Sequence, residues 1–230
     1  MSAIVLLSGG LDSAVNLKQA ADQEGVTLAL TFDYGQRAAR REAAAAAAMC
    51  HQLGLRHRLV RLAWLADVTQ SALVNLQAAI PEVTVNQLDE ERVAGGETAR
   101  AVWVPNRNGV FVNIAAAFAE SLGAQKVVTG FNAEEAATFP DNSAAFVSAC
   151  NALLRLSVAT PVSAISYTQS LTKPEIVQLG RSIGAPLGFI WSCYYGGLEH
   201  CGRCESCARL ERALRAAGAW EWFHVQRMVP

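Results

Sequence analysis

Short apolar runs alternate with longer stretches of helix-favouring residues along most of the chain. Apolar runs of strand length, rich in β-branched side chains, are typical of buried parallel strands, because helices cover both faces of such strands. Two of the helical stretches end at a glycine, a residue that favours the end of a helix. The alternation predicts an α/β fold with a parallel sheet and helices on both faces. The expected strands span 4–7, 26–32, 56–62 and 126–129, and the expected helices span 14–21, 37–53 and 108–122.

The periodicity weakens between residues 64 and 107, where acidic and amide side chains and the pair Gly95-Gly96 interrupt it. Long connections without regular structure are uncommon inside compact domains and are commonly functional or mobile. We therefore predict an insertion or an active-site lid around 64–107, within a first domain that spans residues 1–185. Idle surface is the alternative interpretation.

A capping box marks the last expected helix of that domain. The hydroxyl of Thr172 can accept a hydrogen bond from the backbone amide of Glu175, whose carboxylate reaches back, and Pro174 is tolerated in a first helical turn. Beyond this helix, glycine, proline and aromatic residues lead to a cysteine cluster and a final helix over 205–217. We expect residues 186–230 to form a small C-terminal segment.

Composition and charge narrow the class of protein. Hydrophobic residues make up 52% of the chain, yet no apolar run approaches the roughly 20 residues that cross a bilayer. The N-terminal residues lack the basic region of a secretion signal, so a cytoplasmic protein with no membrane partner is expected. A formal net charge of -1 provides no basic field to attract nucleic acid, which favours a small-molecule substrate and no nucleic-acid partner.

A glycine turn with the sequence SGGLDS, at residues 8–13, joins the first expected strand to the first expected helix. Two glycines allow the backbone to bring its amides close to an anion at a helix N-terminus. Ser8 and Ser13 can donate to pyrophosphate oxygens, and Asp12 can cap the helix or help to hold Mg²⁺. The run lacks the Walker A ending and the three-glycine dinucleotide spacing, so neither γ-phosphoryl transfer nor hydride transfer is indicated. A plain glycine turn with an aspartate cap is the alternative, but it leaves the serine pair unexplained.

Four of the six cysteines crowd into the C-terminal segment, at Cys193, Cys201, Cys204 and Cys207. The C-x7-C-x2-C-x2-C spacing lets one distant thiolate join three closely spaced ones around a tetrahedral ion, so structural Zn²⁺ is the preferred interpretation. A [4Fe–4S] cluster, which also uses C-x2-C-x2-C spacing, and unligated thiols are the alternatives. Cys50 and Cys150 are isolated, and we expect them to be buried structural thiols.

The run at 8–13 resembles the SGGxDS loop of the PP-loop ATP pyrophosphatases, which release pyrophosphate and leave AMP on the substrate. Further segments agree with one family of that superfamily. They are FDYGQR at 32–37, VPNRN at 104–108, FPD at 139–141, TKPEI at 172–176, and WSCY at 191–194 with the three later cysteines. The chain thus resembles the 7-cyano-7-deazaguanine synthase family of queuosine precursor biosynthesis.

This resemblance implies that ATP adenylates 7-carboxy-7-deazaguanine, that ammonia attacks the adenylate to give an amide, and that a second ATP-dependent activation dehydrates the amide to the nitrile. It implies a Rossmann-like parallel sheet of the PP-loop ATPase type with a small C-terminal zinc-binding segment. It also implies Mg²⁺ with ATP, structural Zn²⁺ and a homodimer.

The matching segments supply the candidate site residues. A guanidinium fork suits phosphate or carboxylate, Asp141 can accept from the N1–H and amine of a guanine-like edge, and Phe139 can stack on the ring. For Asp141, capping of the next helix is the alternative. The resemblance assigns catalysis to Arg107, Asp12 and Lys173; ATP binding to Leu7, Ser8, Gly9, Gly10, Leu11, Asp12, Ser13 and Arg37; and substrate binding to Phe139, Asp141, Asn132 and Glu134.

The sequence departs from the family pattern next to the expected base pocket, where Asn142-Ser143 replaces a usual Cys-Arg pair. The departure concerns the substrate more than the adenylation. It leaves open a PP-loop adenylating ligase or thiolase that acts on another carboxylate or on tRNA. A non-catalytic nucleotide-binding protein is the third interpretation. The aromatic tail at 220–223 packs either on the body of the chain or on another subunit.

Overall fold

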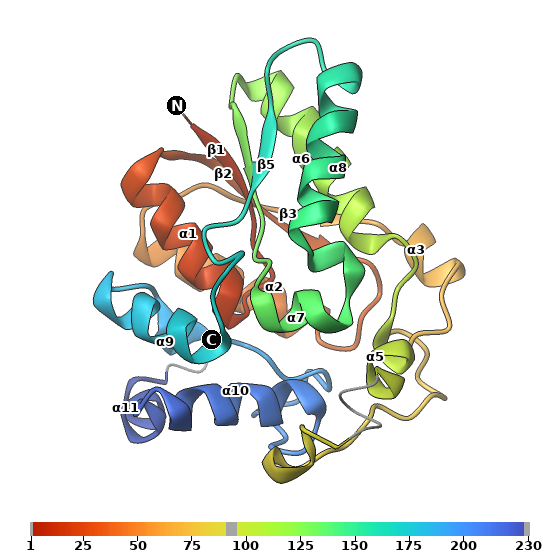
Figure 1. Ribbon diagram of the computed structural model, residues 1–230, viewed down its shortest axis with the longest axis vertical. Helices are drawn as coiled ribbons and strands as arrows, with labels where there is room; N and C mark the ends of the chain where they lie inside the picture. The colour runs from red at the N-terminus through yellow and green to blue at the C-terminus, as the bar shows by residue number, and fades with distance from the viewer. Residues whose placement is uncertain (1, 91–95, 228–230) are drawn as a thin grey trace.

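A parallel sheet lies at the centre of the molecule, as the alternation of strands and helices predicts. The computed structural model describes residues 2–90 and 96–227. Within these ranges the strands are β1 (Ala3–Leu6), β2 (Val26–Asp33), β3 (His57–Arg61), β4 (Lys126–Val128) and β5 (Ser163–Ile165). Their order is β3-β2-β1-β4-β5, and each neighbouring pair is parallel (Figure 1).

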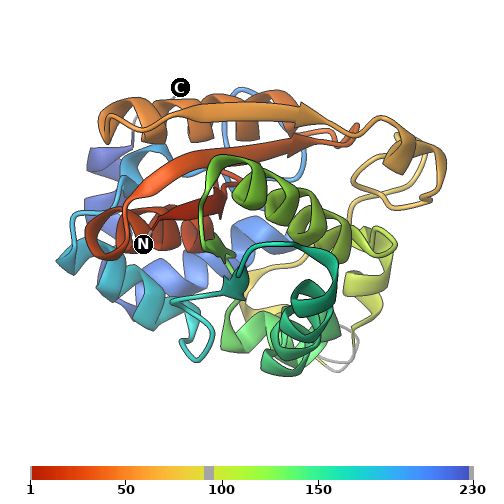
Figure 2. The same ribbon diagram turned by 90° about the horizontal axis from the view of Figure 1, so that it is seen from above.

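Helices cover both faces of this sheet (Figure 2). On one face lie α1 (Leu11–Gln23) and α2 (Ala39–Gln52); α9 (Lys173–Ser182) packs on α1, and α10 (Glu205–Ala216) packs on α9. On the other face lie α6 (Arg107–Leu122) and α8 (Ala144–Ser157). The shorter helices are α3 (Trp64–Asp67), α5 (Glu97–Val102), α7 (Ala133–Thr138) and α11 (Trp220–Gln226), with 3-10 turns at Val85–Gln87, Pro140–Asn142 and Leu187–Phe189.

The first strand shows how the sequence divides the core between the two faces. Side chains of a strand alternate from face to face, so Ala3 and Val5 join the apolar cluster around α1, whereas Ile4 joins the cluster around α6. All three are fully buried. Burying a side chain of the size of Ile4 contributes about 1.5–3 kcal/mol. Both clusters therefore pack against β1 and fix the position of its carboxyl end, where the glycine turn follows.

The structure also contains elements that we do not predict from the sequence, namely α7, α8 and β5. The strand β5 has only three residues, and its centre is an alanine. In α8, Leu153 and Leu156 are exposed at 49% and 89%, while Cys150 and Leu154 are buried and Ser143 caps the helix. The sequence of α8 therefore does carry the pattern of a one-sided helix, and our interpretation of the sequence missed it.

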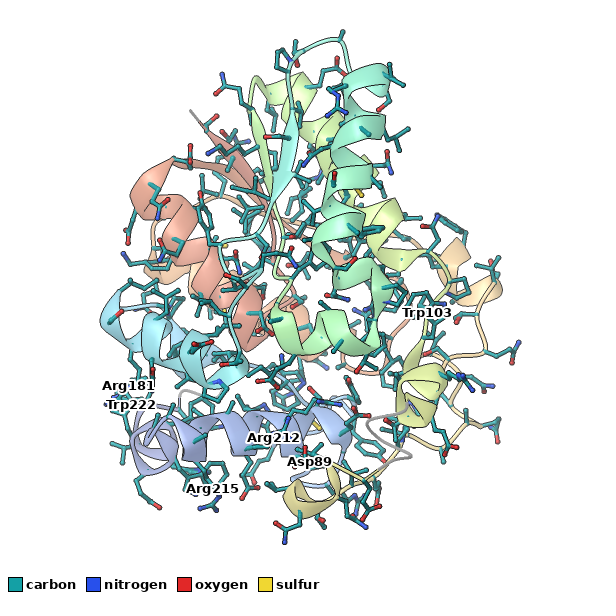
Figure 3. The ribbon with its side chains drawn as sticks, viewed as in Figure 1. Asp89, Trp103, Arg181, Arg212, Arg215 and Trp222 are labelled. Carbon is teal, nitrogen blue, oxygen red and sulfur yellow. The ribbon has the colours of Figure 1, made fainter. Side chains whose placement is uncertain are left out.

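The segment predicted as an insertion or lid is not a free loop where the structure describes it. It contains α3, the turn at Val85–Gln87 and α5, while residues 91–95, including Gly95, lie outside the described residues. Val83 and Leu88 pack against Ala208 of α10. An ion pair of 2.9 Å joins Arg212 of α10 to Asp89 (Figure 3). The described part of this segment is therefore tied to the C-terminal segment.

The aromatic tail packs on the body of its own chain. Phe223 is buried in the cluster around α1, and Trp220 and Trp222 pack against the same cluster. The guanidinium of Arg215 lies 4.4 Å from the ring centre of Trp220, and that of Arg181 lies 5.0 Å from the ring centre of Trp222 (Figure 3). The interpretation of this tail as ordinary core is confirmed.

Two further expectations agree with the structure. The thiols of Cys50 and Cys150 are free and buried, as predicted. Burial raises the pKa of Cys50 to about 12, which suits an unreactive structural thiol. Across the described ranges, no helix combines the length and the apolar character that crossing a bilayer requires.

Candidate active site

The glycine turn forms a tight connection between β1 and α1. Gly10 is the N-cap of α1, and Gly9 has a φ of +82°, in the left-handed region that favours glycine. A Cβ on Gly9 would lie 2.9 Å from the backbone oxygen of Glu42, so α2 packs too closely for any side chain there. The hydroxyls of Ser8 and Ser13 lie 3.2 Å apart at the mouth of the turn. The helix N-terminus and both hydroxyls thus face one anion-sized position.

A charged cluster lies beside the turn. The ammonium of Lys173 donates to Asp12 at 2.8 Å and to Glu135 at 2.7 Å. Burial alone would lower the pKa of Lys173, but the two carboxylates more than offset this and raise it, so Lys173 remains a cation. Asn132 caps α7 by accepting from the amide of Glu135, and its own amide donates to the second oxygen of Asp12 at 3.2 Å. Asn132 therefore fixes the orientation of Asp12.

Arg107 projects from the start of α6 toward the same space. Its guanidinium donates to the hydroxyl of Tyr34 at 3.0 Å and lies 5.7 Å from the centre of that ring. Burial raises the pKa of Tyr34, so this hydroxyl stays neutral beside the arginine. The Tyr34 contact uses one nitrogen of the fork, which leaves the guanidinium charge available to a ligand anion.

Two aromatic rings face each other nearby. Trp103 and Phe139 are almost parallel, at 8°, with ring centres 6.2 Å apart. Asp141 follows in the next turn, where the amide of Asn142 donates to its carboxylate at 3.2 Å, and burial raises the pKa of Asp141. Ser143 caps α8 by accepting from the amide of Phe146. Asp141 is therefore not the helix cap, and the Asn142-Ser143 departure supplies an orienting amide and a cap.

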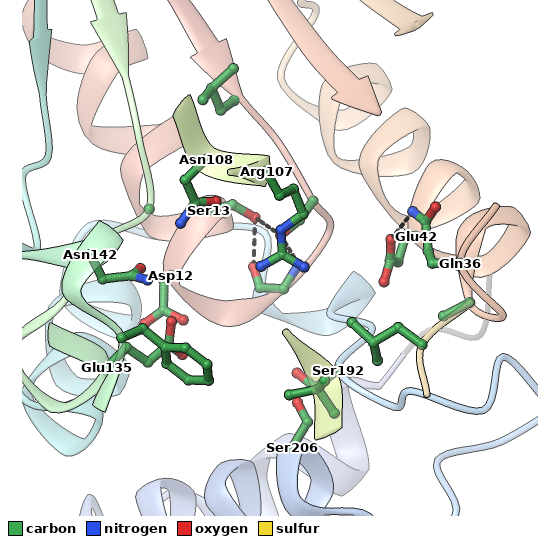
Figure 4. A pocket seen from close by; sticks show the side chains of 18 of the residues that line it. Asp12, Ser13, Gln36, Glu42, Arg107, Asn108, Glu135, Asn142, Ser192 and Ser206 are labelled. Atoms are coloured by element: carbon green, nitrogen blue, oxygen red, sulfur yellow. Dashed lines mark hydrogen bonds between the residues drawn. The ribbon is translucent and has the colours of Figure 1, made fainter. Parts of the chain in front are cut away.

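These groups line one cavity of about 300 Å³. Figure 4 shows Asp12 and Glu135 on one side, Gln36 and Glu42 on the other, and Arg107 between them. Of the residues predicted from the sequence, the cavity wall contains Leu7, Ser8, Gly10, Leu11, Asp12, Ser13, Arg107, Phe139, Asp141 and Lys173.

The other predicted site residues lie behind this wall. Arg37 donates through one nitrogen to the backbone oxygens of Asn75 and Ala78, at 2.8 and 2.6 Å, and so holds the segment 64–107 rather than lining the cavity. Gly9 shapes the turn, and Asn132 supports Asp12. Glu134 accepts from the backbone amide of Lys173 at 2.8 Å, outside the cavity.

The sequence interpretation missed a further set of lining residues. A signal existed for Glu135 and Asn142, which neighbour predicted residues, and for every missed residue in a segment that matched the family. The residues in matched segments are Phe32, Tyr34, Gln36, Asn108, Trp191, Ser192 and Tyr194. Nothing in the pattern pointed to the first turn of α10, because the cysteines around it were interpreted only as a metal staple. The missed lining residues with polar or aromatic side chains are Phe32, Tyr34, Gln36, Glu42, Trp103, Asn108, Phe111, Thr129, Phe131, Glu135, Asn142, Trp191, Ser192, Tyr194, Glu205, Ser206 and Arg209.

The four clustered cysteines form a set that can hold a metal ion. Their sulfur atoms all lie within 4.8 Å of one another, as a tetrahedral thiolate site requires. The backbone amide of Cys204 donates to the sulfur of Cys201 at 3.3 Å, and Cys204 is also the N-cap of α10. Trp191 connects this region to the glycine turn, because its backbone amide donates to Gly9 and its ring nitrogen to Cys193, both at 2.9 Å. The metal-binding set is thus coupled to the cavity.

The parallel sheet, the glycine turn at the end of β1 and the cavity beyond it define a nucleotide-binding α/β protein of the PP-loop type. The chain belongs to the family described as "Queuosine biosynthesis protein QueC", whose model matches residues 2–218.

Curated relatives match over nearly their whole length. A 7-cyano-7-deazaguanine synthase from Pelotomaculum thermopropionicum is 54% identical over 95% of this chain and 98% of its own. One from Desulforudis audaxviator is 53% identical, again over 95% and 98% of the two chains. One from the archaeon Methanosarcina mazei is 43% identical over 95% of each chain. The family resemblance noted in the sequence is therefore confirmed.

Proposed function

We propose that this protein converts 7-carboxy-7-deazaguanine and ammonia to 7-cyano-7-deazaguanine, with ATP driving first adenylation and then dehydration of the amide. The observation that carries the proposal is the single cavity that joins the glycine turn, the cations of Arg107 and Lys173, and a pair of parallel aromatic rings. A nucleotide, a carboxylate and a planar heterocycle can meet there. Family membership supports the same reaction.

The glycine turn is the site proposed for the ATP phosphates. Backbone amides at the start of α1 and the hydroxyls of Ser8 and Ser13 donate hydrogen bonds to them, and the helix N-terminus favours their charge. Asp12 and Glu135 offer hard carboxylate oxygens of the kind that Mg²⁺ prefers, so we assign them to the Mg²⁺ that accompanies ATP. When bound, this ion neutralises the departing pyrophosphate.

Arg107 and Lys173 are the proposed catalytic cations. Adenylation brings the substrate carboxylate against the α-phosphate of ATP, two anions that repel each other before they react. A guanidinium and an ammonium held in a buried cavity stabilise the negative charge that grows on the α-phosphate. Removal of one such preorganised group typically lowers the rate by about 10²–10³-fold.

The rings of Trp103 and Phe139 form the proposed slot for the deazaguanine ring. A planar ring between two others needs about 7 Å, twice the roughly 3.5 Å of carbon–carbon contact. The ring centres are 6.2 Å apart, closer than that spacing, so the two side chains must move apart to admit the base. Asp141, oriented by Asn142, then accepts from the N1–H and amine of the base edge.

The cysteine set is proposed to hold structural Zn²⁺. Four thiolates close the coordination sphere, so the ion supports folding of the C-terminal segment rather than acting as a Lewis acid. Metal analysis of the purified protein tests this assignment. Strong visible absorption from an anaerobically purified sample would instead support a [4Fe–4S] cluster.

The domain division at 185/186, the homodimer and the cytoplasmic location remain our proposals. We infer that the segment 64–107 acts as the lid of the cavity, because Leu73, Val102 and Trp103 contribute to its wall. Sedimentation of the purified protein distinguishes a dimer from a monomer.

The decisive experiment supplies the protein with ATP, Mg²⁺, ammonium and 7-carboxy-7-deazaguanine, and follows AMP release and the mass of the product. Substrate-dependent AMP together with the nitrile is the expected result. Absence of AMP release that depends on this carboxylate would refute the proposal and direct the search to other carboxylates.

A further inference from the structure

The cavity wall carries more acidic than basic side chains. Its described residues include five carboxylates and three basic side chains, an excess of two negative charges. They are Asp12, Glu42, Glu135, Asp141 and Glu205 on the acidic side, and Arg107, Lys173 and Arg209 on the basic side. The proposed organic substrates are anions, so the excess is suited to cations and to N–H donors. Mg²⁺ and the base edge account for three of the carboxylates. Of the other two, Glu42 accepts a hydrogen bond from the side-chain amide of Gln36 at 2.7 Å, and Glu205 has no assigned role.

Glu205 has an unsatisfied oxygen. The residue is 3% exposed and stands in the first turn of α10. Its Oε1 accepts from two nitrogens of Arg209, at 2.8 and 2.6 Å. Its Oε2 is buried and accepts no hydrogen bond from any residue that the structure describes. Leaving a buried charged oxygen without a donor is costly, which points to a donor that arrives with the ligand.

The surroundings of Glu205 indicate a small cationic donor. Glu205 lines the same cavity as the carboxylate of Glu135 and the hydroxyl of Tyr194. The three acceptors come from three parts of the chain, namely α10, α7 and the loop at residue 194. A protein contacts the edge of a planar base from one side. The ammonium ion has four N–H donors in tetrahedral directions, so it suits acceptors that converge from several directions.

We propose that Glu205 binds the ammonium ion that supplies nitrogen to the amide. The inference rests on the proposed function, which requires ammonia as the nucleophile. The bound ammonium gives one proton to water, and the ammonia so formed attacks the acyl carbon of the adenylate beside the wall formed by α10. The carbon–nitrogen bond forms as AMP leaves, and a second proton leaves the nitrogen to give the amide. Arg209 holds Oε1 and thereby presents Oε2 to the ion. The hydroxyls of Tyr194 and Ser206 lie on the same wall and complete the polar lining.

The test separates ammonium binding from adenylation. In the Glu205→Gln variant, we expect the KM for ammonium to rise roughly 10- to 100-fold, the effect of losing one hydrogen bond to a charged group. Carboxylate-dependent ATP–pyrophosphate exchange, measured without ammonium, should stay unchanged. Hydroxylamine is a nucleophile that is uncharged at neutral pH, so its KM should rise by a smaller factor than the KM for ammonium. Glu211→Gln is the matched control, because Glu211 pairs with Arg215 on the same helix at the same spacing, outside the cavity wall.

An unchanged KM for ammonium in Glu205→Gln would overturn the inference. So would a loss of exchange or a raised KM for the deazaguanine carboxylate alone, since Glu205 would then serve adenylation or the base. If Glu205→Gln does not fold, Glu205→Asp replaces it in the test, because aspartate keeps the negative charge opposite Arg209. Glu205→Asp should raise the KM for ammonium by a smaller factor, and an unchanged KM in this variant would also refute the assignment. If the unaltered protein shows no carboxylate-dependent exchange, the proposed function fails first and this inference falls with it.

Discussion

Replacing Lys173 by methionine tests the charged cluster at the centre of the site. The substitution keeps the length of the side chain but leaves Asp12 and Glu135 without their shared cation. At an effective dielectric constant of 20, each contact near 2.8 Å corresponds to about 6 kcal/mol of attraction before desolvation is subtracted. Breaking a buried pair typically costs about 3–5 kcal/mol. Because the side chain of Glu135 is 33% exposed, solvent screens its share, so we expect a loss of about 3 kcal/mol.

Urea unfolding of Lys173→Met against the parent protein measures this loss. Lys18→Met is the control, because Lys18 pairs with Asp22 at an exposed i,i+4 position, and its loss should stay below about 0.5 kcal/mol. Adding Glu135→Gln to Lys173→Met removes one uncompensated charge and should restore part of the stability. A loss in Lys173→Met no larger than that of the control would refute this account of the cluster.

The pH dependence provides a second check. Burial opposes ionisation of Glu135, but Lys173 outweighs it and lowers the pKa of Glu135 in the folded protein. The resulting stabilisation is present above the unfolded pKa, about 4.3, and is lost as the pH falls through the folded pKa. In Lys173→Met, burial remains without the cation and raises the pKa of both carboxylates, so acid stabilises the variant. The difference between the two proteins should therefore shrink as the pH falls from neutrality toward about 4.5.

Three further predictions concern other parts of the site. Trp103→Ala should raise the KM for the deazaguanine carboxylate by roughly 5- to 100-fold, the effect of losing base stacking, with little change in the KM for ATP. Trp64→Ala is the control, because Trp64 is half-exposed, and it should change neither KM. Gly9→Ala should abolish ATP–pyrophosphate exchange, because the new Cβ would collide with α2. Gly54 has a φ of +65° and open space around it, so Gly54→Ala should lower the free energy of unfolding, measured in urea, by only about 1–2 kcal/mol. Cys201→Ser should lower both the metal content and ammonium-dependent turnover.

The fold could be predicted from the sequence where a strand carries an apolar, β-branched run. In β1 this run has four residues, and the glycine turn that follows marks the start of α1. The strand β4 has only three residues but contains a valine pair, whereas β5, equally short, has the sequence Ser-Ala-Ile, which no pattern marks as a strand. The helix α8 is one-sided and begins at a serine cap, so its local pattern was sufficient and our interpretation of the sequence missed it. Tertiary contacts rather than local pattern determine β5.

The residues of the candidate site also differ in how well the sequence predicts their positions. Residues in a recognisable local motif, such as Asp12 and Arg107, do lie at the cavity. Arg37 also belongs to a matched motif, yet its guanidinium holds two backbone oxygens of the segment 64–107. Residue type and motif alone cannot separate a cation that faces a ligand from one that supports a loop. Trp103 and Glu42 reach the cavity only because distant elements converge there, and no local spacing predicts that convergence.

The C-terminal segment is more closely involved in the site than a staple would be. Trp191 ties it to the glycine turn, and Cys204 is both a candidate metal ligand and the cap of α10. The next residue, Glu205, faces the cavity. A metal ion held by the cysteines would therefore fix the register and direction of the first turn of α10. For that reason Cys201→Ser should impair ammonium-dependent turnover, although the side chain of Cys201 lies outside the cavity wall. Cys150→Ser is the control, because Cys150 is a buried thiol far from the cluster in sequence, and it should leave the metal content intact.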